Sequence, residues 1–373
     1  MELKFDTGKE YAVVLEGGGA KGAYEIGAWK ALEEAGVKYN AVAGTSVGAL
    51  NGAMMAMHQL DRAVELWENI TFSQVFDVDD EQMRRLYSGD FQGLEAKTLW
   101  KDVVEAVKGG GLDIEPLRRL VNETVSEEKI RASDVELFLV TYSLTEKKEL
   151  DLNAKELPDG KLADMLLASA YLPLFRREKV DGKEYMDGSV QNLVPLNCLL
   201  QRGYRDIIVI RIFGLGLEKR VKIPKDTDIT TIAPRRKLGG ILQFDSEQSR
   251  KDMQLGYFDA KRALYGLAGE TYYIDQKWDE KRAYFILKTL AENFCRDRKK
   301  GRPFTLREIN EEILPRLAKK TRAKDGDYHR VLTALLERAA EEADIPVFQI
   351  TTEEKLFRAA FVEIVKIFRR LKT

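Results

Sequence analysis

The chain has 373 residues, and 44% of them are hydrophobic, which is enough for a large folded core and excludes global disorder. Its 60 basic and 61 acidic side chains give a formal net charge of -1, which argues against a dedicated nucleic-acid-binding protein. The two cysteines form no CxxC pair, which argues against a disulfide framework and a structural zinc site. We find no ligand pattern for a metal, so no cofactor is predicted.

The first ten residues are polar and lack the apolar segment of a secretory signal. No run of about 18 apolar residues occurs, so no transmembrane helix is expected. These features predict a cytoplasmic protein, and peripheral contact with a membrane stays an open alternative.

Two similar units follow one another near the N-terminus. Residues 11–35 have the pattern of a buried strand, a glycine-rich turn from Gly17 to Gly22, and a helix. Residues 40–58 repeat this order, with the turn from Gly44 to Gly48. Strand–turn–helix units in series predict a parallel sheet that is covered by helices.

The later elements continue this pattern and then change character. The expected helices are 61–70, 97–107 and 162–170, and the expected core strands are 135–142 and 206–213. From about residue 272 the pattern is almost wholly helical and rich in charge. We therefore predict a three-layer α/β/α sandwich with a mainly parallel central sheet in residues 1–268, and a helical C-terminal extension in residues 269–373.

The segment GTSVG places Ser46 between a predicted strand and a predicted helix. A serine in G-x-S-x-G at such a position is typical of a nucleophile elbow, where Gly44 and Gly48 give the backbone room. The start of the helix would place N–H groups near a reacting carbonyl. The alternative is that Ser46 only caps the helix that starts at Val47.

The segment GGGAKG also fits G-x-G-x-x-G, through Gly17, Gly19 and Gly22. A dinucleotide-binding loop would need an acidic residue about 20 positions later, where the sequence has the serine turn instead. The glycines suit an oxyanion hole that is built from backbone N–H groups. Lys21 could add positive charge there, or could be a solvated surface lysine.

A serine nucleophile needs a base, and the chain has only two histidines. His58 follows Ser46 by 12 residues on the same predicted helix, which is about 18 Å along its axis. Nothing local marks His329. A carboxylate is then the best candidate, and Asp187 stands in an Asp-Gly-Ser turn, although an Asp-Gly turn is common by itself.

Together these blocks resemble the patatin-like phospholipase family, whose pattern is a glycine-rich block, G-x-S-x-G and Asp-Gly-Gly or Asp-Gly-Ala, in that order. The stretches 168–175, 191–195 and 234–260 are also similar to the family, the last one to its bacterial members. The resemblance covers residues 10 to 265. It departs from the pattern at Glu16, where the family often has aspartate, and at Ser189, where the family has a glycine or alanine.

The resemblance implies a Ser–Asp dyad, with Ser46 as nucleophile and Asp187 as general base, that hydrolyses ester-linked acyl chains of lipids. It also implies an oxyanion hole. The expected oxyanion-hole residues are Gly17, Gly18, Gly19, Lys21 and Val47, and the expected motif glycines are Gly22, Gly44, Gly48 and Gly188. Two alternatives stay open: a catalytically silent lipid-binding or scaffold protein, and an acyltransferase that uses the same dyad.

Two further surface features have functional and structural interpretations. From residue 355 to 372, apolar residues recur at helical spacing and basic residues lie largely off that stripe. Such a helix can lie on an anionic membrane, but packing against the rest of the chain is favoured. The stripe residues are Phe357, Phe361, Ile364, Phe368 and Leu371. The cluster Arg235-Arg236-Lys237 is interpreted as a solvated loop rather than a phosphate site.

Overall fold

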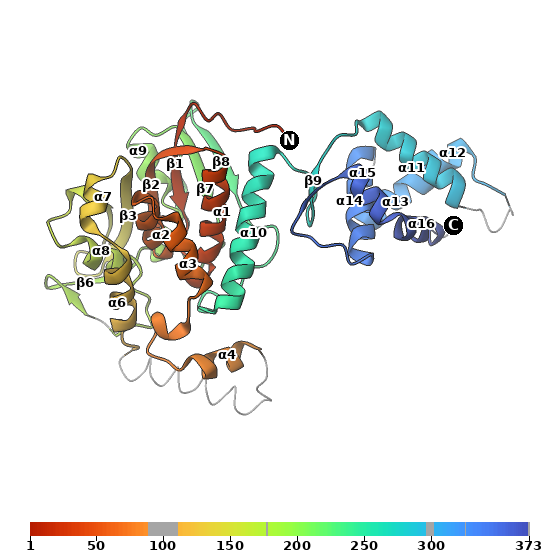
Figure 1. Cartoon of the computed structure of the whole chain (residues 1–373). Coiled ribbons are helices and arrows are strands. Elements are labelled where there is room, and N and C mark those ends of the chain that lie inside the picture. The colour runs from red at the N-terminus through yellow and green to blue at the C-terminus, as the bar shows by residue number, and fades with distance from the viewer. Residues whose placement is uncertain (89–110, 177, 296–301, 325, 372–373) are drawn as a thin grey trace. The chain divides into compact units, whose positions relative to one another are not determined.

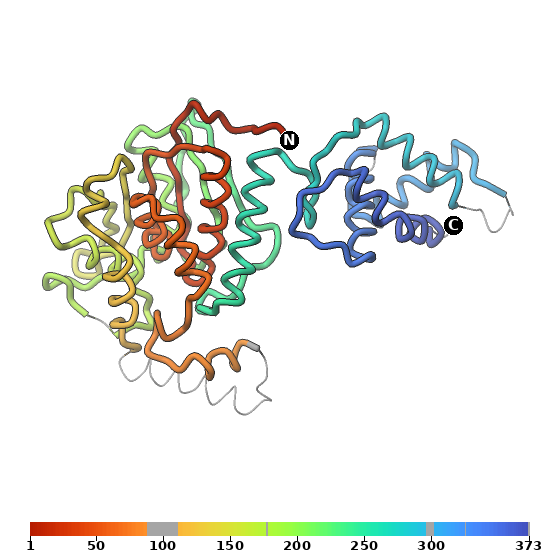
Figure 2. The backbone as a smooth tube through the Cα atoms, in the orientation of Figure 1, coloured from red at the N-terminus to blue at the C-terminus, as the bar shows by residue number. Residues whose placement is uncertain are grey.

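The computed structural model describes residues 1–88, 111–176, 178–295, 302–324 and 326–371. The chain divides into two compact units, one of residues Phe5–Leu264 and one of Met1–Lys4 with Tyr265–Thr373, and Figure 2 traces the backbone of each. The boundary predicted at residues 268 and 269 stays a prediction, and the helix expected at 97–107 lies outside the described residues. No helix in the described part of the chain is long and apolar enough to span a membrane.

The first unit contains a sheet whose five central strands are parallel, in the order β3-β2-β1-β7-β8. These strands are β1 (Glu10–Leu15), β2 (Lys38–Thr45), β3 (Glu136–Ser143), β7 (Asp206–Ile210) and β8 (Asp228–Ile232). Three antiparallel strands join at the β3 side: β4 (Lys148–Asn153), β5 (Lys179–Val180) and β6 (Lys183–Asp187). The mainly parallel sheet predicted from the sequence is therefore confirmed.

Helices cover both faces of this sheet and complete a three-layer α/β/α sandwich. The described helices of this unit are α1 (Ala23–Glu34), α2 (Val47–Ala56), α3 (Leu60–Glu68), α4 (Asp80–Ser88), α6 (Glu115–Thr124), α7 (Glu127–Ala132), α8 (Leu162–Ser169), α9 (Leu196–Gln201) and α10 (Ser246–Tyr265), and α4 lies away from the strands (Figure 1). Short helical turns lie at Gly19–Gly22, Phe72–Gln74, Ala154–Glu156 and Gly188–Val190. Figure 1 shows α1, α2, α3 and α10 together on one side of the strands.

Alternation along the strands decides which residues face each layer. Ala12 and Val14 of β1 pack in one hydrophobic cluster with Leu199 of α9. Leu15 instead points toward α2, since a side chain added at Gly52 would contact it. Because both of their faces are covered, β1, β3 and β7 are continuous apolar runs rather than alternating ones.

The second unit is mainly helical and has its own core. It contains α11 (Glu280–Phe294), α12 (Leu306–Glu308), a π-helical turn (Ile309–Ile313), α13 (Leu314–Thr321), α14 (Tyr328–Glu342), α15 (Glu353–Ala359) and α16 (Phe361–Arg369). Two short parallel strands, β9 (Tyr273–Asp275) and β10 (Ile350–Thr352), pair with each other. Ile364 and Phe368 of the apolar stripe are fully buried in this core, so the packing interpretation of the stripe holds for them.

Candidate active site

Ser46 lies in the tight turn between β2 and α2, with a backbone φ of 56° and ψ of -126°. A positive φ is uncommon for a residue with a side chain and is maintained only by tight surroundings. A Cβ at Gly44 would lie 2.2 Å from the Gly48 carbonyl oxygen, and one at Gly48 would lie 2.6 Å from that of Leu15. The Ser46 side chain makes no capping hydrogen bond, so the helix-cap alternative does not describe it.

Asp187 is brought to Ser46 by the way in which two strands share one edge of β3. Along this edge β2 pairs parallel with β3 up to Thr45 and Val140, and β6 pairs antiparallel from Asp187 and Thr141 onward. The two strands therefore run toward each other and end at neighbouring positions. A Cβ at Gly188 would lie 3.1 Å from Thr45 Cγ2, which confirms the close approach.

The Asp187 carboxyl is buried, with 1% of its surface exposed. Its Oδ1 accepts the Ser189 N–H at 2.8 Å. Burial raises the pKa of Asp187, and the nearby Ser46 hydroxyl and Ser189 lower it in part. No hydrogen bond of ordinary geometry joins Ser46 and Asp187, and Oδ2 has no partner among the described residues. In enzymes, hydrogen bonds between catalytic groups are often long without substrate and shorten when it binds, so this geometry does not exclude the pair as a candidate.

Ser169, at the end of α8, supports the serine turn. The Ser46 N–H donates to Ser169 Oγ at 2.9 Å, and the Ser169 hydroxyl donates to the Val140 carbonyl at 2.6 Å. Sequence reasoning gave Ser169 no role. A small polar residue at the end of an otherwise apolar helix was the available signal, but its partners lie on other elements.

The glycine-rich block has both engaged and open N–H groups. The Gly17 N–H donates to the Leu193 carbonyl at 3.1 Å, so it is engaged, contrary to its expected part in an oxyanion hole. The Gly18 and Gly19 N–H groups have no acceptor among the described residues. Val47 is the first residue of α2, where N–H groups have no acceptor within the helix. Gly22 packs directly on the Val47 side chain, which holds the block against the serine turn.

Lys21 is directed to the β7 side of the glycine block. Its ammonium donates to the Phe213 carbonyl at 2.6 Å, and burial lowers its pKa. It thus braces the loop that follows β7, and we find no contact between Lys21 and Ser46 among the described residues.

Glu16 is a buried residue whose role the sequence reasoning missed. Its carboxylate has no exposed surface and accepts the Arg211 guanidinium at 2.7 Å. It also accepts the backbone N–H groups of Ile212 at 2.8 Å and Gly214 at 3.0 Å. Glu16 therefore fixes the end of β7 beside the glycine block. The only signal in the sequence was an acidic residue directly before three glycines.

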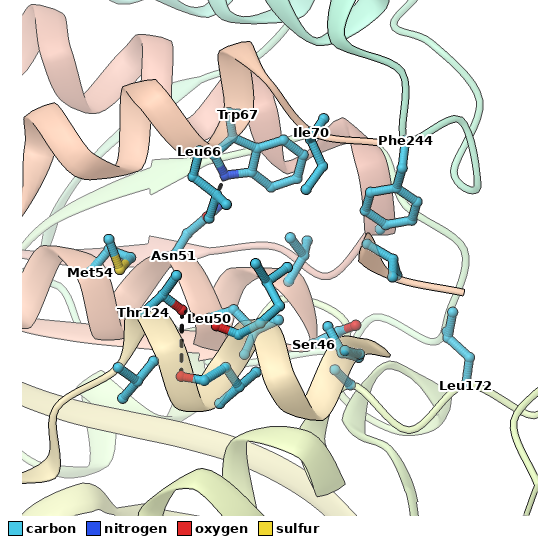
Figure 3. Close-up of a pocket in the computed structure, with 18 of the residues that line it drawn as sticks. Ser46, Leu50, Asn51, Met54, Leu66, Trp67, Ile70, Thr124, Leu172 and Phe244 are labelled. Carbon is cyan, nitrogen blue, oxygen red and sulfur yellow. Dashed lines mark hydrogen bonds between the residues drawn. The ribbon is translucent and has the colours of Figure 1, made fainter. Parts of the chain in front are cut away.

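An apolar pocket extends from Ser46 between α2, α3 and α6 (Figure 3). Leu50 and Met54 follow Ser46 at intervals of four residues, so they line one face of α2 over about 12 Å. The opposite walls are formed by Leu66, Trp67, Ile70, Val75, Leu117, Leu120, Val121, Phe175 and Phe244. An apolar group attached at Ser46 would therefore lie against a continuous apolar surface along α2.

Asn51 is a polar residue in this wall, and its amide is fully engaged. It donates to the Glu25 carboxylate at 2.8 Å and accepts the Trp67 indole N–H at 3.0 Å. Burial raises the pKa of Glu25 well above its usual value, although Asn51 lowers it in part. The cavity wall is therefore apolar in effect, and a buried acid lies behind it.

The two histidines lie elsewhere. His58 follows the end of α2, and its Nε2 pairs with the Asp134 carboxylate at 2.9 Å near the surface. His329 belongs to the second unit, where its Nε2 pairs with Glu353 at 3.1 Å.

The family model described as Patatin-like phospholipase matches residues 13–200, which is half of the chain. The chain belongs to the patatin-like phospholipase family. Among curated proteins, Patatin-like phospholipase domain-containing protein 6 of Mus musculus is 56% identical over 217 residues. That match covers 55% of this chain and 14% of the mouse protein.

Other similar proteins have been found at lower coverage or identity. Lysophospholipase nte1 of Aspergillus terreus is 51% identical over 49 residues, which is 13% of this chain and 3% of the fungal protein. Among solved structures, VipD from Legionella pneumophila is 15% identical, with a TM-score of 0.42 over 97% of this chain and 85% of that chain. The chain thus spans only a small part of the length of its curated relatives.

Proposed function

We propose that this family member is a serine hydrolase that cleaves ester-linked acyl chains from lipids, with phospholipase A-type activity. Ser46 is the nucleophile and Asp187 the general base. The observation that carries the proposal is the meeting of these two residues at the ends of β2 and β6. The names of the relatives, phospholipase and lysophospholipase, support the same reaction class.

In the first step, Asp187 accepts the proton of the Ser46 hydroxyl while Oγ attacks the ester carbonyl carbon. The carbonyl π electrons move to oxygen and form a tetrahedral oxyanion. The N–H groups of Gly18, Gly19 and Val47 donate to this oxygen, and the N-terminus of α2 adds its dipole. The raised pKa of Asp187 makes it a stronger base than an exposed aspartate.

The intermediate then collapses and breaks the bond to the alcohol. The leaving alkoxide takes the proton from Asp187, and the acyl group remains on Ser46. Water attacks this acyl-serine, transfers its proton to Asp187, and the second collapse releases the fatty acid and returns the proton to Ser46 Oγ. An acyltransferase would run the same steps with an acceptor alcohol in place of water, so its products would distinguish it.

The test is hydrolysis of a short-chain p-nitrophenyl ester and of phospholipid vesicles by wild type, Ser46→Ala and Asp187→Asn. We expect each substitution to lower kcat by at least about 10³-fold while the fold is retained. His58→Ala is the matched control and should keep wild-type activity. Wild-type rates in both variants would show that the site is wrong, and an inert wild type that still binds lipid would favour the silent alternative.

The cavity adds a chain-length test. Among soluble p-nitrophenyl esters, kcat/KM should rise by up to about fourfold for each methylene that enters the cavity. Leu50→Trp should remove this rise while leaving hydrolysis of the shortest ester intact, because Leu50 lines the cavity one helical turn from Ser46. A rise that persists in Leu50→Trp would place the acyl chain elsewhere.

A further inference from the structure

The loop after β7 exposes an unusual number of large apolar side chains. Phe213 is 53% exposed, Leu215 78% and Leu217 59%, within five residues of one another. Single exposed apolar residues are normal on a soluble fold, but a group of them usually marks a binding surface. We call residues 213–217 the apolar loop.

The apolar loop is fixed to the sheet by several hydrogen bonds. Glu16 accepts the N–H groups of Phe213 and Gly214, and Lys21 donates to the Phe213 carbonyl. Phe213 has a φ of 48°, which is rare for a bulky residue and is maintained only by surrounding contacts. The fold therefore holds these apolar side chains outward against a local conformational cost.

The apolar loop lies beside the candidate active site, within the same unit. Because β7 pairs with β1, the loop is next to the glycine block, and a Cβ at Gly18 would lie 3.3 Å from Gly214 Cα. At the other end of the apolar loop, the Leu217 N–H donates to the Ser189 carbonyl at 2.9 Å. Ser189 follows Asp187 by two residues. The loop therefore contacts both the proposed oxyanion donors and the turn of the proposed base.

Two basic side chains follow the strand next to the one that leads into the apolar loop. Arg236 and Lys237 follow β8, the strand next to β7, and both are exposed without an ion pair among the described residues. The segment that carries them continues to the glycine block, because the Ala20 N–H donates to the Ile241 carbonyl at 2.7 Å. The nearby acids Glu149 and Glu218 are already paired, with Lys219 and Arg211 respectively.

We propose that the apolar loop, with Arg236 and Lys237, is an interfacial contact that docks the carboxyl edge of the sheet on an anionic phospholipid surface. This inference rests on the proposed lipid substrate and adds to it a binding surface. Apolar side chains that enter the headgroup region and cations that face anionic lipids are the two contributions that hold a peripheral protein on a membrane. The bound orientation brings the glycine block and Ser46 close to the lipids.

The experiment measures flotation of the full chain with vesicles of phosphatidylcholine, alone and mixed with phosphatidylglycerol. Ser46→Ala serves as the background, so that binding is measured without turnover. Leu215→Ser with Leu217→Ser should weaken partitioning by about tenfold or more. The matched control is Phe285→Ser with Val362→Ser, which changes two side chains of similar exposure in the second unit, 63% and 64%.

Three outcomes decide the inference. Loss of binding in the loop variant, with binding kept in the control, supports it. Unchanged binding in the loop variant overturns it, and loss only in the control assigns membrane contact to the second unit instead. When the loop substitutions are made in the chain that keeps Ser46, the variant should hydrolyse a soluble short-chain ester at the wild-type rate. This assay distinguishes a loss of catalysis from a loss of membrane docking.

A second variant tests the charge. Arg236→Ser with Lys237→Ser should abolish the preference for vesicles that contain phosphatidylglycerol and leave binding to phosphatidylcholine alone unchanged. A preference that survives both substitutions would contradict the proposed role of these two cations. Light scattering completes the test, because a loop variant that loses self-association but keeps vesicle binding would overturn docking on lipid in favour of contact between copies of this chain.

Discussion

Two buried glutamates illustrate how the two units differ. Glu353 in the second unit accepts the Lys277 N–H and the His329 ring, and its surroundings are helices with an ordinary apolar core. Glu16 in the first unit is equally buried, but the backbone it holds includes the strained Phe213 beside the glycine block. A buried glutamate that accepts hydrogen bonds therefore stabilises the helical fold in the second unit and the backbone of the candidate site in the first.

Unsatisfied buried groups show the same contrast. Asp187 Oδ2 and Glu25 Oε1 lack partners in the first unit, and no such side-chain atom occurs among the described residues of 265–373. Buried polar atoms without partners are costly and are expected where function requires them. The comparison places the unsatisfied buried side-chain atoms of the described residues in the first unit, and two of them belong to Asp187 and Glu25, beside Ser46 and behind its pocket.

Among substitutions that compare the two units directly, the largest effect is expected from replacing each of these glutamates by glutamine. Glu16→Gln should lower kcat/KM on a soluble ester by about 10²-fold, because a displacement near 1 Å at the oxyanion donors is enough. Glu353→Gln should leave kcat/KM unchanged and lower the free energy of unfolding by about 1–3 kcal/mol. Kinetics and urea unfolding of both variants check this, and a Glu353→Gln variant with impaired chemistry would break the comparison.

The next effect concerns Asp187 and pH. Since burial raises its pKa, the acid limb of kcat/KM should have its midpoint above the reference value of about 3.9. A carboxyl whose pKa is raised on folding makes the folded state less stable as pH rises toward and through that pKa. Asp187→Asn should therefore be inactive yet unfold at a higher temperature than wild type at neutral pH. A lower melting temperature for Asp187→Asn would contradict this sign.

The smallest effect is expected for Glu25, which lies behind the cavity wall. Its pKa is raised well above the usual value by burial, so the neutral acid is the form that the fold favours, and glutamine resembles it. Glu25→Gln should stay within about 1 kcal/mol of wild type and gain relative stability as pH rises. Urea unfolding in acidic and alkaline buffer measures this. A relative loss at alkaline pH would show that the charged carboxylate is needed.

Much of the site could be predicted because its signals are local. The serine elbow depends on glycines within two residues of Ser46, and the parallel sheet on strand–turn–helix order, both of which are visible in the chain. Ser169 and Glu16 could not be assigned, because their partners, Val140 and residues 211–214, lie far along the sequence. Gly17 was included among the expected donors because the sequence does not show that its N–H is already engaged: the acceptor, the Leu193 carbonyl, is distant in sequence.

By itself the sequence determined the order of elements, the serine turn and the family resemblance, because hydrophobic period and glycine spacing act over a few residues. Only the tertiary structure decided that β2 and β6 end head to head on β3, which is what joins Ser46 to Asp187. It also decided that the stripe at Ile364 and Phe368 is buried while the loop at Leu215 is exposed. The physical reason is that strand register and burial depend on contacts between segments that are distant in sequence. The spacing of apolar residues along the chain is the same whether or not another segment covers them.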